Sequence, residues 1–112
     1  DDMREAPSLA IIENLLLSGA KIKAYDPAAM KEAQRILGQK IIYSKDQEEA
    51  VVDVDALLIV TEWAEFRLPN FKVLGELMKY KVIFDGRNIF EPAEMKELGF
   101  TYFSIGRKAI IQ

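Results

Sequence analysis

Hydrophobic and polar positions follow one another along this chain in a pattern that predicts helices and strands in turn. Apolar residues spaced three and four apart from Leu9 to Leu16, with Gly19 beyond them, predict a first helix. Further helices are predicted at 28–37, 46–49, 71–78 and 92–98. The strands predicted between them are 21–25, 40–43, 56–60, 81–84 and 100–105, with 108–111 as a possible extra strand. Ser44 is predicted to cap the short acidic helix at 46–49.

Strands separated by helices of this length form βαβ units, in which the paired strands are parallel. The segment 56–60 is apolar without alternation, which is typical of a parallel strand covered on both faces. The sequence therefore predicts an α/β fold: one three-layer, Rossmann-like domain over residues 1–112, with a mostly parallel sheet. The segment 62–70 is predicted to be a loop with a helical turn.

Composition narrows the chemistry that this chain can perform. Its 112 residues include no cysteine and no histidine, which excludes a thiolate nucleophile, a cysteine-bound zinc and an imidazole base. Fifteen basic and 18 acidic residues give a net charge of −3, so nucleic acid is not an expected partner. No apolar run is long enough to span a membrane. We expect a cytoplasmic binding module rather than a complete enzyme, and the start at Asp1-Asp2-Met3 favours an excised piece over a processed product.

Residues that follow the strands are the candidates for function, because ligands of parallel α/β sheets bind beyond the carboxyl ends of the strands. Such segments are 26–27, 61–63, 85–88 and 104–107. In the segment 85–88, Gly86 would allow a backbone conformation that other residues cannot adopt. Arg87 would offer its planar guanidinium to a phosphate or carboxylate. The alternative for Arg87 is a structural salt bridge to a nearby carboxylate such as Asp85.

Three other residues are weaker candidates for binding a ligand. Asp26 stands where a dinucleotide fold holds a ribose hydroxyl, but no G-x-G-x-x-G turn occurs, so capping of the next helix is favoured. Trp63 could stack on a ligand ring, although beside Phe66 it is more typical of a core or interface anchor. Arg4 precedes the first helix, where it could help to bind an anion or simply form part of an exposed terminus.

Five segments in this order together resemble the C-terminal domain of the UDP-glucose/GDP-mannose dehydrogenase family. They are Asp2–Ser8, Gly19–Pro27, Asp55–Trp63 with Phe66, Phe84–Asn88 and Phe100–Arg107. The resemblance implies a parent enzyme with an N-terminal Rossmann domain that carries NAD and a central domain that carries the catalytic cysteine. It also implies two oxidations at C6 of the sugar, from UDP-glucose to UDP-glucuronate, through covalent intermediates on that cysteine.

The same resemblance implies roles for two arginines of this chain. Arg87 would contact the UDP-sugar, and Arg4 would lie near the phosphates of NAD, which is bound mainly by a domain absent from this chain. No catalytic residue and no metal ligand is assigned. The implied partners are the UDP-sugar and the remaining domains of the parent enzyme. Two alternatives stay open: a stand-alone nucleotide-binding or regulatory module without redox activity, and an interaction domain that uses Trp63 and Phe66.

One departure from the family affects the expected sheet. The family domain usually opens with a strand and a Gly-rich turn that contains Phe-Lys, directly before the Asp-x-Arg motif, whereas this chain begins at that motif. The first strand and the substrate-binding lysine are therefore predicted to be missing, which leaves open edges at 21–25 and 56–60. We expect a homo-oligomer in which a copy lends a strand or the copies otherwise associate; direct closure or insertion of 108–111 are the alternatives.

Overall fold

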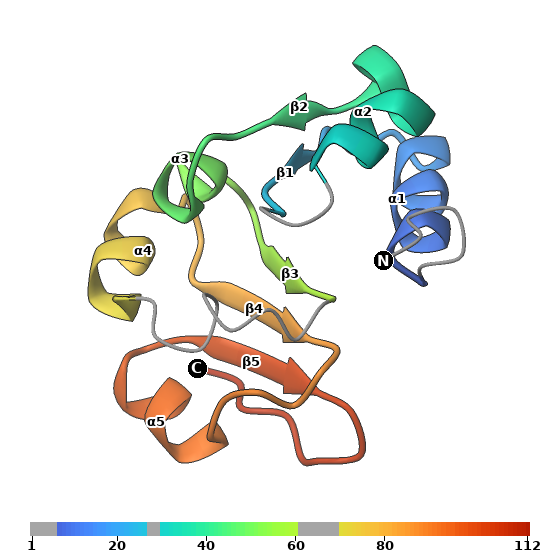
Figure 1. Cartoon of the computed structure of the whole chain (residues 1–112). Helices are drawn as coiled ribbons and strands as arrows, with labels where there is room; N and C mark the ends of the chain where they lie inside the picture. The colour runs from blue at the N-terminus through green and yellow to red at the C-terminus, as the bar shows by residue number, and fades with distance from the viewer. Residues whose placement is uncertain (1–6, 27–29, 61–69) are drawn as a thin grey trace. The chain divides into compact units, whose positions relative to one another are not determined.

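The computed structural model describes residues 7–26, 30–60 and 70–112 (Figure 1). Its helices are α1 (Pro7–Leu17), α2 (Met30–Leu37), a 3-10 turn (Gly38–Lys40), α3 (Gln47–Val51), α4 (Phe71–Leu77) and α5 (Pro92–Glu97). Its strands are β1 (Lys23–Ala24), β2 (Ile42–Tyr43), β3 (Leu57–Ile59), β4 (Val82–Asp85) and β5 (Thr101–Ser104). Each helix and strand predicted from the sequence has a counterpart, and the loop predicted at 62–70 lies almost wholly outside the described residues. No helix in the described ranges is long and apolar enough to cross a membrane.

Contacts divide the chain into two compact units, residues 1–50 and 51–112. In the first unit β1 and β2 pair in parallel, with α2 between them along the chain. In the second unit the strand order is β3-β4-β5, again all parallel. The predicted α/β class with parallel strands is therefore confirmed, with the strands in two sheets. The single domain over residues 1–112 stays a prediction.

The end of the chain pairs with the outer edge of the larger sheet. Ile110 forms an isolated antiparallel bridge with Tyr102 of β5, in which the two backbone N–H···O distances are 2.8 and 2.9 Å. This segment therefore extends the sheet beyond β5 and does not lie beside β3, so its insertion next to β3 is not what the structure shows. Self-association through open strand edges stays a prediction.

The acidic helix α3 is capped by Asp46 and not by Ser44, so that prediction was wrong. Asp46 Oδ1 accepts the backbone N–H of Glu49 at 2.8 Å, and Glu49 Oε1 accepts the backbone N–H of Lys45 at 3.0 Å. Asp46 takes the role because it directly precedes the first helical residue, where its side chain reaches the free amides. Ser44 is instead buried, and its hydroxyl has no hydrogen-bond partner in the described part of the chain.

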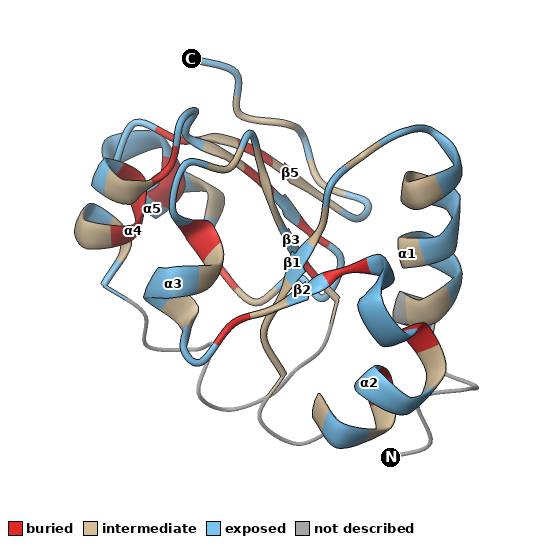
Figure 2. Cartoon of the chain, turned by 90° about the horizontal axis from the view of Figure 1, so that it is seen from above, coloured by how far each residue is buried: buried red, intermediate tan, exposed pale blue. Residues whose placement is uncertain are grey.

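The main hydrophobic core lies in the second unit, where α4 and α5 pack on one face of the β3–β4–β5 sheet (Figure 2). Ile83 of β4 and Tyr102 of β5 are opposite one another and fully buried, and Met95 of α5 packs in the same cluster. Phe71 of α4 meets Phe90 edge-on, with ring centroids 4.6 Å apart. These contacts anchor both ends of the segment that connects β4 to α5.

The opposite face of this sheet carries a row of apolar residues. Leu58, Phe84 and Phe103 are in register across the three strands, and the rings of Phe84 and Phe103 stack at 4.9 Å. Phe84 is 43% exposed and Leu58 is 39% exposed. Among the described residues of this unit, helices cover only one face of the sheet, so these residues do not provide the two-sided coverage predicted for 56–60.

Candidate functional site

The loop that follows β4 is folded around the carboxylate of Asp85. This side chain is 1% exposed. Its Oδ1 accepts the backbone N–H of Arg87 at 3.0 Å, and its Oδ2 accepts the backbone N–H groups of Ile89 at 2.8 Å and Phe90 at 3.1 Å. Oδ2 also accepts the Tyr102 hydroxyl at 2.7 Å. Four donors match the capacity of an ionised carboxylate, so a single buried side chain determines the path of residues 86–90.

Tyr102 connects this carboxylate to a guanidinium. Its hydroxyl donates to Asp85 and accepts from Arg107 Nη2 at 2.8 Å, while Arg107 Nε donates to Ser104 Oγ at 2.9 Å. Burial, followed by the hydrogen bond to Asp85, raises the pKa of Tyr102 above its ordinary value, and Arg107 partly opposes this rise. Tyr102 is therefore a protonated donor to Asp85 at neutral pH.

Gly86 is required at the start of the loop for a reason other than the predicted one. Its φ is not in the left-handed region, and the residue of this turn that adopts a positive φ is Asn88, at 52°. Gly86 instead donates its backbone N–H to the carbonyl oxygen of Ile59 at 2.8 Å. A Cβ atom at position 86 would lie 3.1 Å from that oxygen. The loop thus passes directly over the end of β3.

Gly86→Ala is expected to lower the free energy of unfolding by about 1–3 kcal/mol, because the new methyl group meets a backbone oxygen that cannot move alone. Urea unfolding measures the change. Gly75→Ala in α4 is the comparison: its Cβ would lie 3.0 Å from the flexible Lys81 side chain and 3.3 Å from the Phe100 ring, so it would meet side chains and no backbone atom. Alanine also favours the helix there, so the loss should be smaller. Equal losses in both variants would contradict this account.

The structure places Arg87 on the exposed loop at the carboxyl end of β4. The hydrogen bond that joins it to Asp85 comes from its backbone N–H. The substrate role and the salt-bridge alternative for its guanidinium both stay predictions. Arg4, Trp63 and Phe66 lie outside the described residues, as do residues 27–29, where the helix that Asp26 was predicted to cap would begin.

Sequence reasoning did not assign roles to Asn88, Tyr102 or Arg107. Asn88 Nδ2 donates to the carbonyl oxygen of Ile105 at 2.8 Å, and Asn88 Oδ1 accepts the backbone N–H of the same residue at 2.8 Å. One signal was available for Tyr102. Alternation along 100–105 places it on the same face as Phe100, and a buried tyrosine needs a partner for its hydroxyl.

The family model for the UDP-glucose/GDP-mannose dehydrogenase family, UDP binding domain, matches residues 1–92. This chain belongs to that family. The resemblance stated from the five sequence segments is thereby confirmed, and the loop after β4, up to the start of α5, lies within the matched residues.

Several relatives are UDP-glucose 6-dehydrogenases. The chain is 42% identical over 111 residues to YwqF and 46% identical over 110 residues to TuaD, both from Bacillus subtilis. These matches cover 99% and 98% of this chain but only 25% and 24% of the relatives, so the chain spans about a quarter of their length. A solved structure of UDP-D-ManNAc dehydrogenase from Pyrococcus horikoshii is also similar, with a TM-score of 0.53 and 25% identity. That match covers 87% of this chain and 29% of the other.

The described residues of this family member assign no site for NAD. The 112 residues contain no G-x-G-x-x-G turn, and β1 is followed by Tyr25 and Asp26. No step of a redox reaction is therefore derived for residues of this chain.

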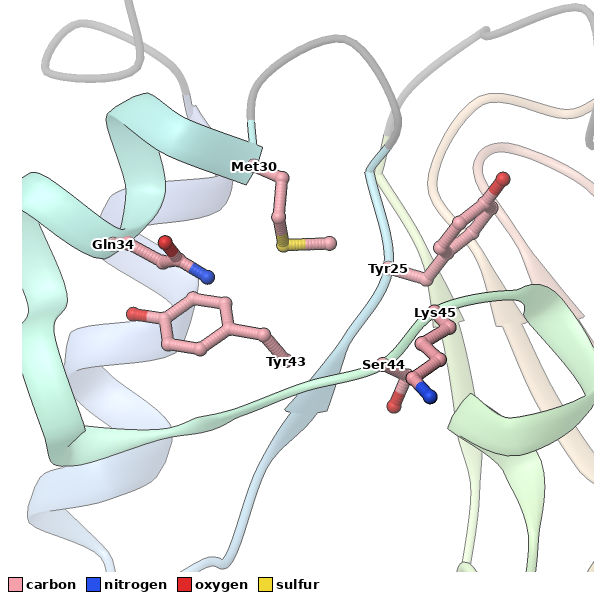
Figure 3. Close-up of a pocket in the computed structure, with 6 residues that line it drawn as sticks. All are labelled: Tyr25, Met30, Gln34, Tyr43, Ser44 and Lys45. Carbon is pink, nitrogen blue, oxygen red and sulfur yellow. The ribbon is translucent and has the colours of Figure 1, made fainter.

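A hollow of about 360 Å³ lies beside the ends of β1 and β2 in the first unit (Figure 3). Its lining residues are Tyr25, Met30, Gln34, Tyr43, Ser44 and Lys45. Met30 and Gln34 extend from α2 toward the ring of Tyr43, whose hydroxyl donates to the carbonyl oxygen of Gly38 at 2.8 Å. Burial raises the pKa of Tyr43. Arg87, which was predicted to bind the substrate, is not among these lining residues.

Proposed function

We propose that this chain binds the UDP part of the substrate in a larger, NAD-dependent UDP-glucose 6-dehydrogenase of the cytoplasm, which oxidises UDP-glucose to UDP-glucuronate. The observation that carries the proposal is the loop around Asp85, which presents Arg87 at the carboxyl end of a parallel sheet. That end is where sheets of this type bind their ligands. Membership in the family supports a nucleoside diphosphate sugar as the ligand.

The chemistry of the loop suits a diphosphate. Arg87 is exposed, and its backbone is held by a hydrogen bond to the buried carboxylate of Asp85. A guanidinium forms paired, charge-assisted hydrogen bonds with phosphate oxygens. Arg107, after the neighbouring strand β5, adds a second positive charge at the same end of the sheet. We therefore assign Arg87 to the UDP moiety.

The remaining parts of the reaction belong to the rest of the proposed enzyme. Conversion of the C6 alcohol to a carboxylate removes four electrons, consumes one water molecule and reduces two NAD to two NADH. We assign the cysteine nucleophile and the main NAD site to the other domains, and we place Arg4 near the NAD phosphates. The proposed enzyme is a homo-oligomer. The names of the relatives favour this function over a stand-alone module without redox activity, and the interaction residues Trp63 and Phe66 lie outside the described residues.

Arg87→Ala in the full-length dehydrogenase is expected to raise the KM for UDP-glucose about ten- to a hundredfold, because a charge-assisted hydrogen bond contributes about 1.5–3 kcal/mol. The KM for NAD should stay nearly unchanged. Arg87→Lys should recover only part of the loss, since an ammonium lacks the planar fork. Steady-state kinetics with each substrate varied in turn measures all three values.

Arg35→Ala is the matched control for this experiment. Arg35 is an exposed arginine of α2 that forms an ion pair with Glu32 of the same helix, so its loss removes one positive charge from the other unit of the chain. Its KM for UDP-glucose should equal that of the unmodified enzyme. A KM that Arg87→Ala leaves unchanged would exclude the substrate role and favour a structural salt bridge.

A further inference from the structure

Two loops meet at the carboxyl end of the larger sheet. Figure 1 shows that β4 and β5 run side by side and point the same way, so the segments that follow them emerge together. The first loop carries Arg87 and the second carries Arg107. Asn88 joins them, because its side-chain amide exchanges two 2.8 Å hydrogen bonds with the backbone of Ile105. The positive φ of Asn88 turns the chain so that both bonds form with one residue.

A second connection between these loops runs through the interior of the unit. Arg107 donates to the Tyr102 hydroxyl at 2.8 Å, that hydroxyl donates to Asp85 at 2.7 Å, and Asp85 accepts the N–H of Arg87 at 3.0 Å. Arg107 also polarises the phenol and strengthens its donation to the buried carboxylate. Three hydrogen bonds in series therefore link the Arg107 side chain to the Arg87 backbone.

We propose that Asn88 and Arg107 are positioning residues for Arg87, which hold the substrate-binding loop against the loop after β5 before the substrate arrives. The inference rests on the proposed role of Arg87. A loop that is already ordered loses less conformational entropy when it binds, so its contacts contribute more of their energy to affinity. Loosening either connection weakens the binding of the UDP-sugar although the guanidinium of Arg87 remains in the protein.

Of the two connections between the loops, the one made by the Asn88 side chain can be removed with the smaller change to the protein. Asn88→Gly keeps the backbone conformation accessible and removes both hydrogen bonds to Ile105. In the full-length dehydrogenase it should raise the KM for UDP-glucose about fivefold to tenfold, with kcat and the KM for NAD nearly unchanged. Tyr102→Phe tests the interior connection, because it removes the hydroxyl between Arg107 and Asp85 and keeps both positive charges; it should raise the KM for UDP-glucose in the same range.

A matched control separates positioning from a general loss of stability. Gln112 Nε2 donates to the carbonyl oxygens of Phe100 at 2.8 Å and Lys96 at 3.2 Å, at the opposite end of β5. Gln112→Ala therefore also removes two side-chain hydrogen bonds to backbone, in the same unit. It should lower the melting temperature about as much as Asn88→Gly does and leave the KM for UDP-glucose unchanged.

The double variant Arg87→Ala/Asn88→Gly tests whether Asn88 acts through Arg87. Its KM for UDP-glucose should match that of Arg87→Ala alone, because a loop without the guanidinium has nothing left to position. Multiplied effects would overturn the inference, as would an Asn88→Gly enzyme with normal KM beside an Arg87→Ala enzyme with raised KM; both outcomes leave the proposed function standing. A normal KM in Arg87→Ala itself would instead overturn the proposed function.

Discussion

Replacing Asp85 by alanine is expected to lower the free energy of unfolding by about 3–5 kcal/mol, a large fraction of the 5–15 kcal/mol typical of a domain. The variant leaves three backbone N–H groups without their acceptor, and the Tyr102 hydroxyl keeps only its longer contact to the carbonyl oxygen of Phe90, at 3.1 Å. The N–H of Phe90 and the Tyr102 hydroxyl belong to buried residues, so water does not readily replace the carboxylate for them. The N–H of Arg87 lies on the exposed loop and can be hydrated. The total loss of unfolding free energy is therefore smaller than four times the cost of an unpaired buried donor.

Asp85→Asn gives an independent measure of the same network. An amide oxygen in the Oδ2 position would still accept from Ile89, Phe90 and Tyr102, while the amide NH₂ would face the N–H of Arg87. The loss should therefore be smaller than in the alanine variant. Asp55→Ala, which removes an exposed carboxylate of the same unit, is the control and should change stability by less than about 0.5 kcal/mol. Urea unfolding of the three variants measures these losses. Similar unfolding midpoints for Asp85→Ala and Asp55→Ala would show that Asp85 does not hold the loop.

The 112-residue chain by itself is expected to produce no NADH from NAD and UDP-glucose. It contains neither cysteine nor histidine, and it contains no G-x-G-x-x-G turn for the phosphates of NAD. The family resemblance implies that the thiol nucleophile lies in a different domain, so we expect this chain by itself to lack both the covalent intermediate and the hydride acceptor. The absorbance of the reduced nicotinamide, followed over hours at high protein concentration, measures the rate.

A full-length relative such as TuaD of Bacillus subtilis is the positive control, assayed in the same buffer and at the same concentration of sites. If the purified chain produced NADH and its Arg87→Ala variant did not, the result would contradict the assignment of the cysteine and the main NAD site to other domains. A trace rate that Arg87→Ala leaves unchanged would indicate a contaminating dehydrogenase instead.

The positions of the helices and strands follow from the sequence because local chemistry decides them. Apolar spacing predicted α1 and its end near Gly19, and Gly19 adopts the left-handed φ of 90° that closes such a helix. Pro92 was expected in the first turn of α5 and lies there, since its fixed φ and missing N–H suit that position. The family, too, could be recognised from the order of short segments along the chain. For the function, the sequence indicated Arg87 through its place after a strand.

Only the tertiary structure decided what surrounds Arg87. Asp85 and Tyr102 are 17 residues apart along the chain, and they meet because β4 and β5 pair with Asp85 opposite Ser104. The same register brings Asn88 to Ile105. No local pattern encodes such a register, because it depends on how α4 and α5 pack the core face of the sheet. Pairing likewise decided that the strands form two sheets, since hydrogen bonds between strands join backbone groups whose partners lie far away in the sequence.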